Sequence, residues 1–126
     1  MENGFPGGSI PQIQFGIVDV REVALAHVRC IERDAAQGQR FLLFGQTLWF
    51  REVAVILEKH YASQGYIIPT VESKYCLVKI FSLFSRRMQA ASRFWGREFH
   101  GNNSRSKNVL GIEYRPARDS VIEMVD

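Results

Sequence analysis

The chain has 126 residues, of which 46% are hydrophobic and 23% are charged, and its formal net charge is +3 at pH 7. This length and composition predict a single globular domain over residues 1–126 and exclude an intrinsically disordered chain. The positive charge is small and mixed in sign along the chain, so it is weak evidence for a nucleic-acid or membrane partner. The two cysteines, Cys30 and Cys76, lie far apart in the sequence, and we expect reduced, buried thiols of a cytosolic protein.

The first 12 residues contain Gly, Pro, Ser and Asn and are predicted to form a loop or a loosely held arm. They lack the basic and apolar regions of a secretory signal peptide, so we expect a cytoplasmic protein. The longest apolar stretch, near residues 75–84, is interrupted by Lys79 and Ser82. It is too short and too polar to span a bilayer.

The apolar run at residues 15–20 predicts a short strand, and a helix should follow it. Asp19 and Glu22 have the spacing of a capping box, in which each side chain binds the backbone amide of the other residue. Helical spacing then predicts one buried face, which comprises Val23, Ala24, His27, Cys30 and Ile31. A second apolar run at residues 40–44 predicts another strand, stopped by Gly45. The intervening segment is long enough for a helix, so the economical interpretation is a parallel βαβ unit covered on both faces.

The second half of the chain is predicted to be mainly helical. Thr47 can cap a helix that ends at Gly65, and residues 73–94 are expected to be helical, in one or two pieces. A short helix should then run through Leu110, with Gly111 just after its end.

Two further predictions concern where the last two helices begin, and together with the strands they give the fold class. Asn103 or Ser104 can cap the short helix that ends at Leu110. Pro116 suits the first turn of a last helix, whose dipole Asp119 complements. The predicted fold class is therefore α/β, with short parallel strands and surrounding helices.

Tyr75 and Lys79 lie four residues apart, which places both side chains on one face of a predicted helix. Some reductases use this spacing: the tyrosine hydroxyl donates a proton to a substrate carbonyl, and the lysine ammonium lowers the tyrosine pKa. Ser63 also stands upstream, as such enzymes require. However, no glycine-rich dinucleotide fingerprint follows a strand in this sequence. We therefore favour a coincidence, with Tyr75 partly buried and Lys79 extending its ammonium to water.

Three other patterns have a functional and a structural interpretation. The glycines from Gly4 to Gly8 could be misread as a phosphate-binding loop, but no strand precedes them and a plain loop is favoured. His27 and Cys30 could share a helix face, but two ligands do not make a zinc site, so we interpret His27 as a hydrogen-bonded core histidine and predict no metal. A set of basic and aromatic residues resembles a nucleic-acid stacking surface, although a solvated basic face over an aromatic anchor is favoured: Arg86, Arg87, Arg93, Phe94, Trp95, Arg97, Phe99, Arg105 and Lys107.

Two segments resemble a known family. The first is FGIVDVREVALAH at residues 15–27, and the second is FWGREF at residues 94–99, continued by NSRSK at residues 103–107 and LGIEYRP at residues 110–116. Their order, with RFLL between them, is similar to the C-terminal part of extended short-chain dehydrogenase/reductases. The dihydroflavonol reductase and cinnamoyl-CoA reductase group is the branch they resemble, and it is related to the NAD-dependent epimerase/dehydratases.

The resemblance implies an oxidoreductase that uses NAD(P)H on the carbonyl of a small organic substrate. In that family the dinucleotide-binding Rossmann domain and the catalytic Ser and Tyr-x-x-x-Lys precede the first segment. We therefore expect this chain to be a fragment, alternative product or truncated gene model that covers the substrate-binding lobe, inactive and without cofactor by itself. In that family, side chains of this lobe close over the substrate, and we choose Phe15 and Ile17, near the end of the first predicted strand, as the pocket-lining positions.

Two alternatives remain open at this stage. Helices that pack on a Rossmann domain would expose apolar faces here, which favours a non-catalytic module that associates with itself or with another protein. Trp49, Phe50, Phe81 and Phe84 are candidates to line an apolar pocket, with core packing as the default interpretation. Nucleic-acid binding is the weaker alternative.

Overall fold

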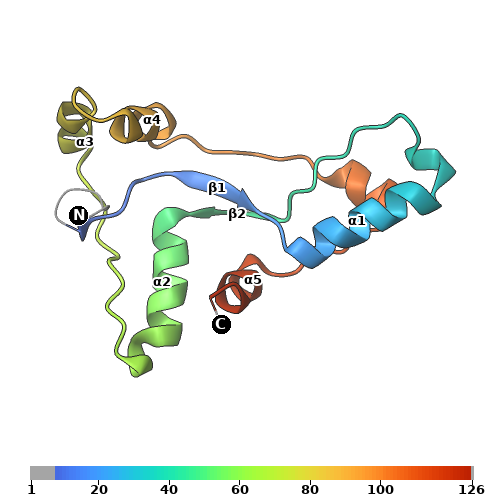
Figure 1. The fold of residues 1–126 in the computed structure, drawn as a ribbon, viewed down its shortest axis with the longest axis horizontal. Helices are drawn as coiled ribbons and strands as arrows, with labels where there is room; N and C mark the ends of the chain where they lie inside the picture. Colours follow the sequence, from blue (N-terminus) through green and yellow to red (C-terminus); the bar gives the residue numbers. More distant parts are fainter. Residues whose placement is uncertain (1–7, 126) are drawn as a thin grey trace. The chain divides into compact units, whose positions relative to one another are not determined.

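A computed structural model describes residues 8–125, which form two compact units, each made from two stretches of chain (Figure 1). The first unit contains the described residues up to Phe15 together with Leu48–Glu98. The second unit contains Gly16–Thr47 and the described residues from Phe99 onward. Part of the predicted N-terminal arm and most of the Gly4–Gly8 stretch lie outside the described residues.

The two strands, β1 (Gln14–Ile17) and β2 (Gln46–Trp49), form a two-stranded sheet. Within the first unit the Phe50 amide donates to the Ile13 carbonyl at 2.9 Å, and within the second the Gly45 amide donates to the Ile17 carbonyl at 3.0 Å. As the residue number rises on one strand it falls on the other, so the pairing is antiparallel. The predicted parallel arrangement is therefore wrong.

The predicted strand at residues 40–44 is also wrong, because β2 begins two residues later. Phe41 and Leu43 pack against the core of the second unit, but Leu42 between them is exposed. The backbone of Phe44 is bound by side chains in place of a strand: its amide donates to the Tyr114 hydroxyl at 3.4 Å, and its carbonyl accepts from the Asn103 amide at 2.5 Å.

The second unit also contains α1 (Val20–Glu32), a 3₁₀ turn η2 (Asp34–Ala36), a π-helical turn η4 (Ser106–Leu110) and α5 (Ala117–Glu123). Its core consists of Ala26, Ala36, Leu110 and Ile112. Gly111 ends η4 with a φ of 66°, a left-handed conformation that glycine adopts readily, as the sequence predicts. Pro116 precedes α5, and Asp119 lies in its first turn, which also agrees with the prediction.

Helix α1 begins as predicted but buries a different face. Asp19 caps it and forms the predicted capping box with Glu22. The buried residues are Glu22 and Ala26, whereas His27, Cys30 and Ile31 of the predicted face are exposed. Glu22 lies inward because its second carboxylate oxygen accepts a hydrogen bond from the Arg115 amide at 2.5 Å. Cys76 is exposed as well, so the expectation of buried thiols is wrong for both free cysteines.

The first unit contains α2 (Phe50–Tyr61), a 3₁₀ turn η3 (Ala62–Gln64), α3 (Tyr75–Phe81) and α4 (Arg86–Phe94). Helix α2 begins at Phe50, because Thr47 belongs to β2 and the Trp49 amide donates to the Glu52 carboxylate at 2.7 Å. Gly65, with a φ of 84°, ends η3 and thus the helical segment that begins with α2.

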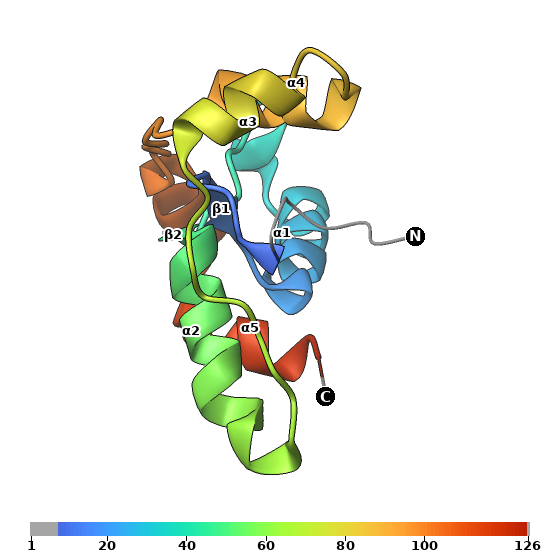
Figure 2. The same cartoon turned by 90° about the vertical axis from the view of Figure 1, so that its left-hand side faces the viewer.

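Residues 73–94 form two helices, α3 and α4, joined by a short turn (Figure 2). Val78 is the buried residue of α3, and Ala91 is buried on α4. The other apolar side chains of α3 and of the turn are exposed.

Candidate functional site

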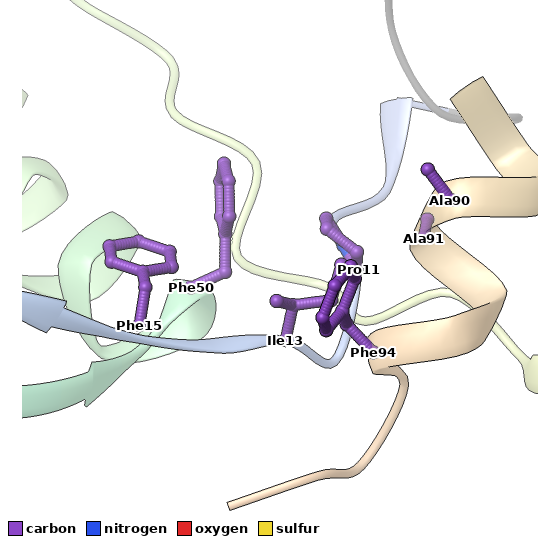
Figure 3. Close-up of a pocket in the computed structure, with 7 residues that line it drawn as sticks. All are labelled: Pro11, Ile13, Phe15, Phe50, Ala90, Ala91 and Phe94. Carbon is purple, nitrogen blue, oxygen red and sulfur yellow. The ribbon is translucent and has the colours of Figure 1, made fainter. Parts of the chain in front are cut away.

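An apolar pocket of about 360 Å³ lies within the first unit (Figure 3). Its walls come from the segment around β1, from the first residue of α2 and from one face of α4. The lining residues are Pro11, Ile13, Phe15, Phe50, Ala90, Ala91 and Phe94. A volume of this size lies within the range of pockets that bind small organic molecules.

One wall is an aromatic pair, Phe15 from β1 and Phe50 from α2. Their ring centroids are 5.9 Å apart and the rings are nearly perpendicular, which is the favourable edge-to-face geometry. The hydrogen bond from the Phe50 amide to the Ile13 carbonyl fixes the start of α2 beside this part of the chain. Figure 3 shows the two rings side by side at one end of the pocket.

The opposite wall belongs to α4. Ala90, Ala91 and Phe94 follow helical i, i+1 and i+4 spacing, and the two small alanine side chains leave space beside the larger ring. After the helix, the Gly96 amide donates to the Gln12 carbonyl at 2.9 Å, which ties the end of α4 to the segment before β1. The pocket is therefore held by backbone hydrogen bonds at both walls.

The chemistry of this pocket is that of apolar binding. None of the described residues that line it carries a polar side chain, so the lining offers no proton donor, nucleophile or metal ligand. What it can do is remove apolar surface of a ligand from water, which stabilises a complex by about 25 cal/mol per Å² buried.

The structure places only some of the predicted pocket residues in the pocket lining. Phe15 is part of the pocket wall, whereas Ile17 is not among the lining residues. Of the four aromatic candidates, Phe50 lines the pocket, but Phe81 and Phe84 are exposed side chains of α3 and of the turn after it. The alanine face of α4 and Phe94 were missed; their i, i+1, i+4 spacing was the available signal.

Tyr75 and Lys79 lie on α3 and are not among the lining residues of the pocket. The Tyr75 ring is 47% exposed and contacts Trp95, with ring centroids 5.8 Å apart. Lys79 is exposed. Ser63 is exposed in η3.

The second unit contains a cluster of charged residues around the buried carboxylate of Asp19. This carboxylate accepts from the Arg21 guanidinium at 2.8 and 2.7 Å, from the Ser120 hydroxyl at 2.8 Å and from Arg115 at 3.4 Å. The bonds from the Arg21 side chain and amide hold the pKa of Asp19 far below its usual range, against the opposing effect of burial. The cluster joins the first turn of α1 to α5.

Glu123 extends the same cluster to the surface. It accepts from Arg115 at 2.8 Å and also from Arg21. These hydrogen bonds, that from Arg115 being the stronger influence, lower the pKa of Glu123 to about 2. The same pairs raise the pKa of both arginines. Because every charge is matched by an opposite charge nearby, we interpret the cluster as structural.

A second polar network links η4 to the segment before β2. The buried Ser106 hydroxyl donates to the Asn103 carbonyl at 2.8 Å and lies 2.7 Å from the Tyr114 hydroxyl. Tyr114 accepts from the Phe44 amide, and the Asn103 side chain returns to the Phe44 carbonyl. The network is closed on itself, which is typical of a structural element.

The described residues include no group of three or more His, Cys, Asp or Glu side chains that could hold a metal ion. His27 is hydrogen-bonded as predicted, from its ring to the Val23 carbonyl at 2.7 Å, but it is exposed and not in the core. Within residues 8–125, no helix has both the length and the apolarity needed to cross a bilayer.

The chain is similar to parts of several solved structures. Two structures of Gre2 from Candida albicans, one of them a complex with NADPH, are 27% and 25% identical to this chain, both with a TM-score of 0.68. Each match covers 98% of this chain and 32% of the other. The chain shares the fold of a part of these reductases. No family model matches it, and no curated protein does.

A yeast methylglyoxal/isovaleraldehyde reductase, Gre2 in complex with NADPH, is 20% identical with a TM-score of 0.68. That match covers 97% of this chain and 31% of the yeast protein. This chain thus spans about a third of the length of the reductases that it matches. The likeness to the yeast protein concerns the fold alone.

Proposed function

We propose that this chain forms the substrate-binding lobe of an NAD(P)H-dependent oxidoreductase that reduces the carbonyl group of a small organic molecule. The observation that carries the proposal is the match of 98% of the chain, at a TM-score of 0.68, to about a third of a reductase in complex with NADPH. The segments at residues 15–27 and 94–116 support the same family. On this proposal the two units act together as one lobe in the cytoplasm.

In this proposal the pocket of the first unit receives the apolar part of the substrate. Phe15, Phe50 and Phe94 would cover that group and exclude water from it. The cofactor would supply hydride when bound, and the family resemblance assigns its site and the proton donor to a preceding part of the enzyme. This chain contributes binding and orientation, and by itself it should neither bind NADPH tightly nor turn over a carbonyl substrate.

Isothermal titration of the chain with NADPH tests the division of labour. We expect no saturable heat, and no oxidation of NADPH when an aldehyde is added. Tight NADPH binding together with aldehyde-dependent oxidation would refute the proposal that the chemistry lies elsewhere. If that activity occurs, Tyr75→Phe decides whether the tyrosine on α3 provides the proton, because the substitution keeps the ring and removes the hydroxyl.

Nuclear magnetic resonance tests the pocket with isovaleraldehyde as the probe. We expect chemical-shift changes at the amides of Phe15 and Phe50, and an affinity at least about fivefold weaker in Phe50→Ala, since an aromatic contact contributes about 1 kcal/mol. Phe84→Ala is the matched control, because that ring is exposed and outside the pocket lining. Equal losses in both variants, or shifts elsewhere, would contradict the assignment of the pocket.

A second candidate function is a non-catalytic interaction module, and the exposed face of α1 favours it. Val20 and Ile31 on this helix are 78% and 88% exposed, and Val28 between them is also exposed. An apolar stripe of this kind favours self-association or a protein partner. Analytical ultracentrifugation distinguishes the cases: a concentration-dependent dimer that Ile31→Ser abolishes would support this function, and a monomer at all concentrations would oppose self-association.

A further inference from the structure

The segment at residues 73–97 is unusual in its charge. It contains six cations and no acidic residue, while the other ten cations share the rest of the chain with all 13 acids. The net charge of +3 therefore conceals a strongly basic segment. In the structure this segment forms α3, the turn after it and α4, all within the first unit. Five of the cations are exposed: Lys74, Lys79, Arg86, Arg93 and Arg97.

The same segment exposes large apolar side chains. At the turn, Leu83 and Phe84 are 79% and 86% exposed. On α3, the burial of Val78 leaves Leu77, Ile80 and Phe81 at least partly in solvent. Helices α3 and α4 and the turn between them form a helical hairpin (Figure 2), and this hairpin carries both exposed apolar side chains and exposed cations.

The backbone amides of the turn are paired within the hairpin. The amides of Leu83, Phe84 and Ser85 donate to carbonyls of Ile80 and Phe81 at 3.2, 3.1 and 3.0 Å. The Ser82 hydroxyl donates to the Lys79 carbonyl at 2.6 Å. A segment whose amides are satisfied internally can enter an apolar phase without leaving donors unpaired, which is the main requirement that a bilayer imposes on a backbone.

We propose that α3, the following turn and the start of α4 bind the surface of an anionic membrane. Leu83 and Phe84 would enter the boundary between headgroups and acyl chains, and the flanking lysines and arginines would contact anionic headgroups. This proposal does not depend on the reductase function. On this proposal the turn would lie in the plane of the interface, as a peripheral element that does not cross the bilayer.

Charge favours a lipid surface over a protein partner. Lysine is depleted in the cores of protein interfaces, whereas Lys74 and Lys79 here flank the apolar side chains. Basic residues beside apolar side chains on a helical element are typical of proteins that bind anionic lipid. Nucleic acid would use the cations but gives no role to the aliphatic side chains of Leu83 and Ile80.

Vesicle sedimentation of the purified chain tests the proposal. Vesicles of phosphatidylcholine with about 30% phosphatidylserine should retain the chain, and vesicles of phosphatidylcholine alone should not. Binding should weaken as salt rises from about 0.1 M to about 0.5 M, because the headgroup attraction is screened. No binding to the anionic vesicles, or equal binding to both kinds, would overturn the proposal.

Two pairs of variants separate the apolar and the charged contributions. Leu83→Ser with Phe84→Ser should weaken vesicle binding at least about tenfold, and Ile67→Ser is the control, because Ile67 is 97% exposed outside the hairpin. Arg86→Gln with Arg93→Gln should weaken vesicle binding about 25-fold, since each cation contributes about a factor of five.

Arg118→Gln, an exposed cation of the second unit, is the control for charge. Circular dichroism confirms that each variant is folded. If the hairpin variants bind anionic vesicles as tightly as their controls do, residues 73–97 do not form the membrane-binding surface and the proposal is overturned. Retention by single-stranded RNA together with absence of vesicle binding would replace the lipid by a nucleic acid and overturn the proposal.

Discussion

The substitution Asp19→Asn isolates the charge at the centre of the second unit. Asparagine caps helices about as well as aspartate, so the backbone of α1 keeps its cap. What disappears is the negative charge that pairs with Arg21 and Arg115. The substitution therefore measures the ion pairs without removing the shape of the side chain.

The expected loss of stability follows from how deeply the paired side chains are buried. Removing one partner of a fully buried ion pair costs about 3–5 kcal/mol. The Asp19 side chain is 4% exposed, but those of Arg21 and Arg115 are 57% and 37% exposed, so water screens both pairs. We expect a loss of about 2 kcal/mol, which lowers the urea midpoint by about 1 M at neutral pH.

The effect should depend on pH in a defined direction. The pKa of Asp19 is lowered by folding, so its stabilisation is complete above the unfolded pKa of about 4 and is lost as the pH falls toward the folded value. The difference in the free energy of unfolding between the wild type and Asp19→Asn should therefore be constant above about pH 5 and should narrow between about pH 4 and pH 2.

Urea unfolding followed by circular dichroism measures this difference. Hydrogen exchange then locates it: amides of α1 and α5 should exchange about 30-fold faster in Asp19→Asn, as 2 kcal/mol requires. Glu113→Gln removes an exposed charge from the same unit and serves as the control. Two results would refute the assignment of stability to these ion pairs. One is a difference in the free energy of unfolding that does not narrow in acid, and the other is a loss of stability no larger than that of Glu113→Gln.

Three further predictions concern the same unit. Gly101→Ala should cost about 1–3 kcal/mol by thermal unfolding, because a Cβ there would lie 2.6 Å from the Phe44 ring; no destabilisation would show that the ring moves freely. Ser106→Ala should cost about 1–3 kcal/mol, because it removes a fully buried hydroxyl and leaves the part-buried hydroxyl of Tyr114 with one partner fewer, and an unchanged melting temperature would contradict this. Glu123→Gln should flatten the loss of helix between about pH 4.5 and pH 2, because two guanidinium groups lower the pKa of Glu123 to about 2; identical acid titrations by circular dichroism would oppose that role.

The pocket was only partly predictable. Phe15 and Phe50 could be named from the sequence because they are large apolar residues next to predicted element boundaries. The alanines of α4 could not, since a small side chain lines a pocket only when its helix lies against the right neighbour. That position is fixed by the hydrogen bond from the Gly96 amide to the Gln12 carbonyl, between residues far apart in sequence.

The positive charge of residues 73–97 can be counted from the sequence, but the small net charge of the whole chain hides it. The rest of the chain has ten cations and 13 acids, so it cancels half of the positive charge of residues 73–97 and leaves the whole chain at only +3. Only the fold indicates which of the apolar residues beside these cations remain in solvent.

Local features were determined by the sequence itself. The capping box of Asp19 and Glu22, the left-handed ends at Gly65 and Gly111 and the start of α5 after Pro116 all depend on residues within one turn of each other. Their physical causes are side-chain capping, the freedom of glycine and the fixed φ of proline, and each acts without distant neighbours.

The tertiary structure decided which distant residues pair with which polar groups. The apolar run at residues 40–44 is compatible with a strand, but the backbone of Phe44 binds Tyr114 and Asn103 instead. The face of α1 that is buried is set by Glu22, whose carboxylate accepts from the Arg115 amide. A buried polar group must be paired, and the sequence alone does not indicate which distant partner provides that pair.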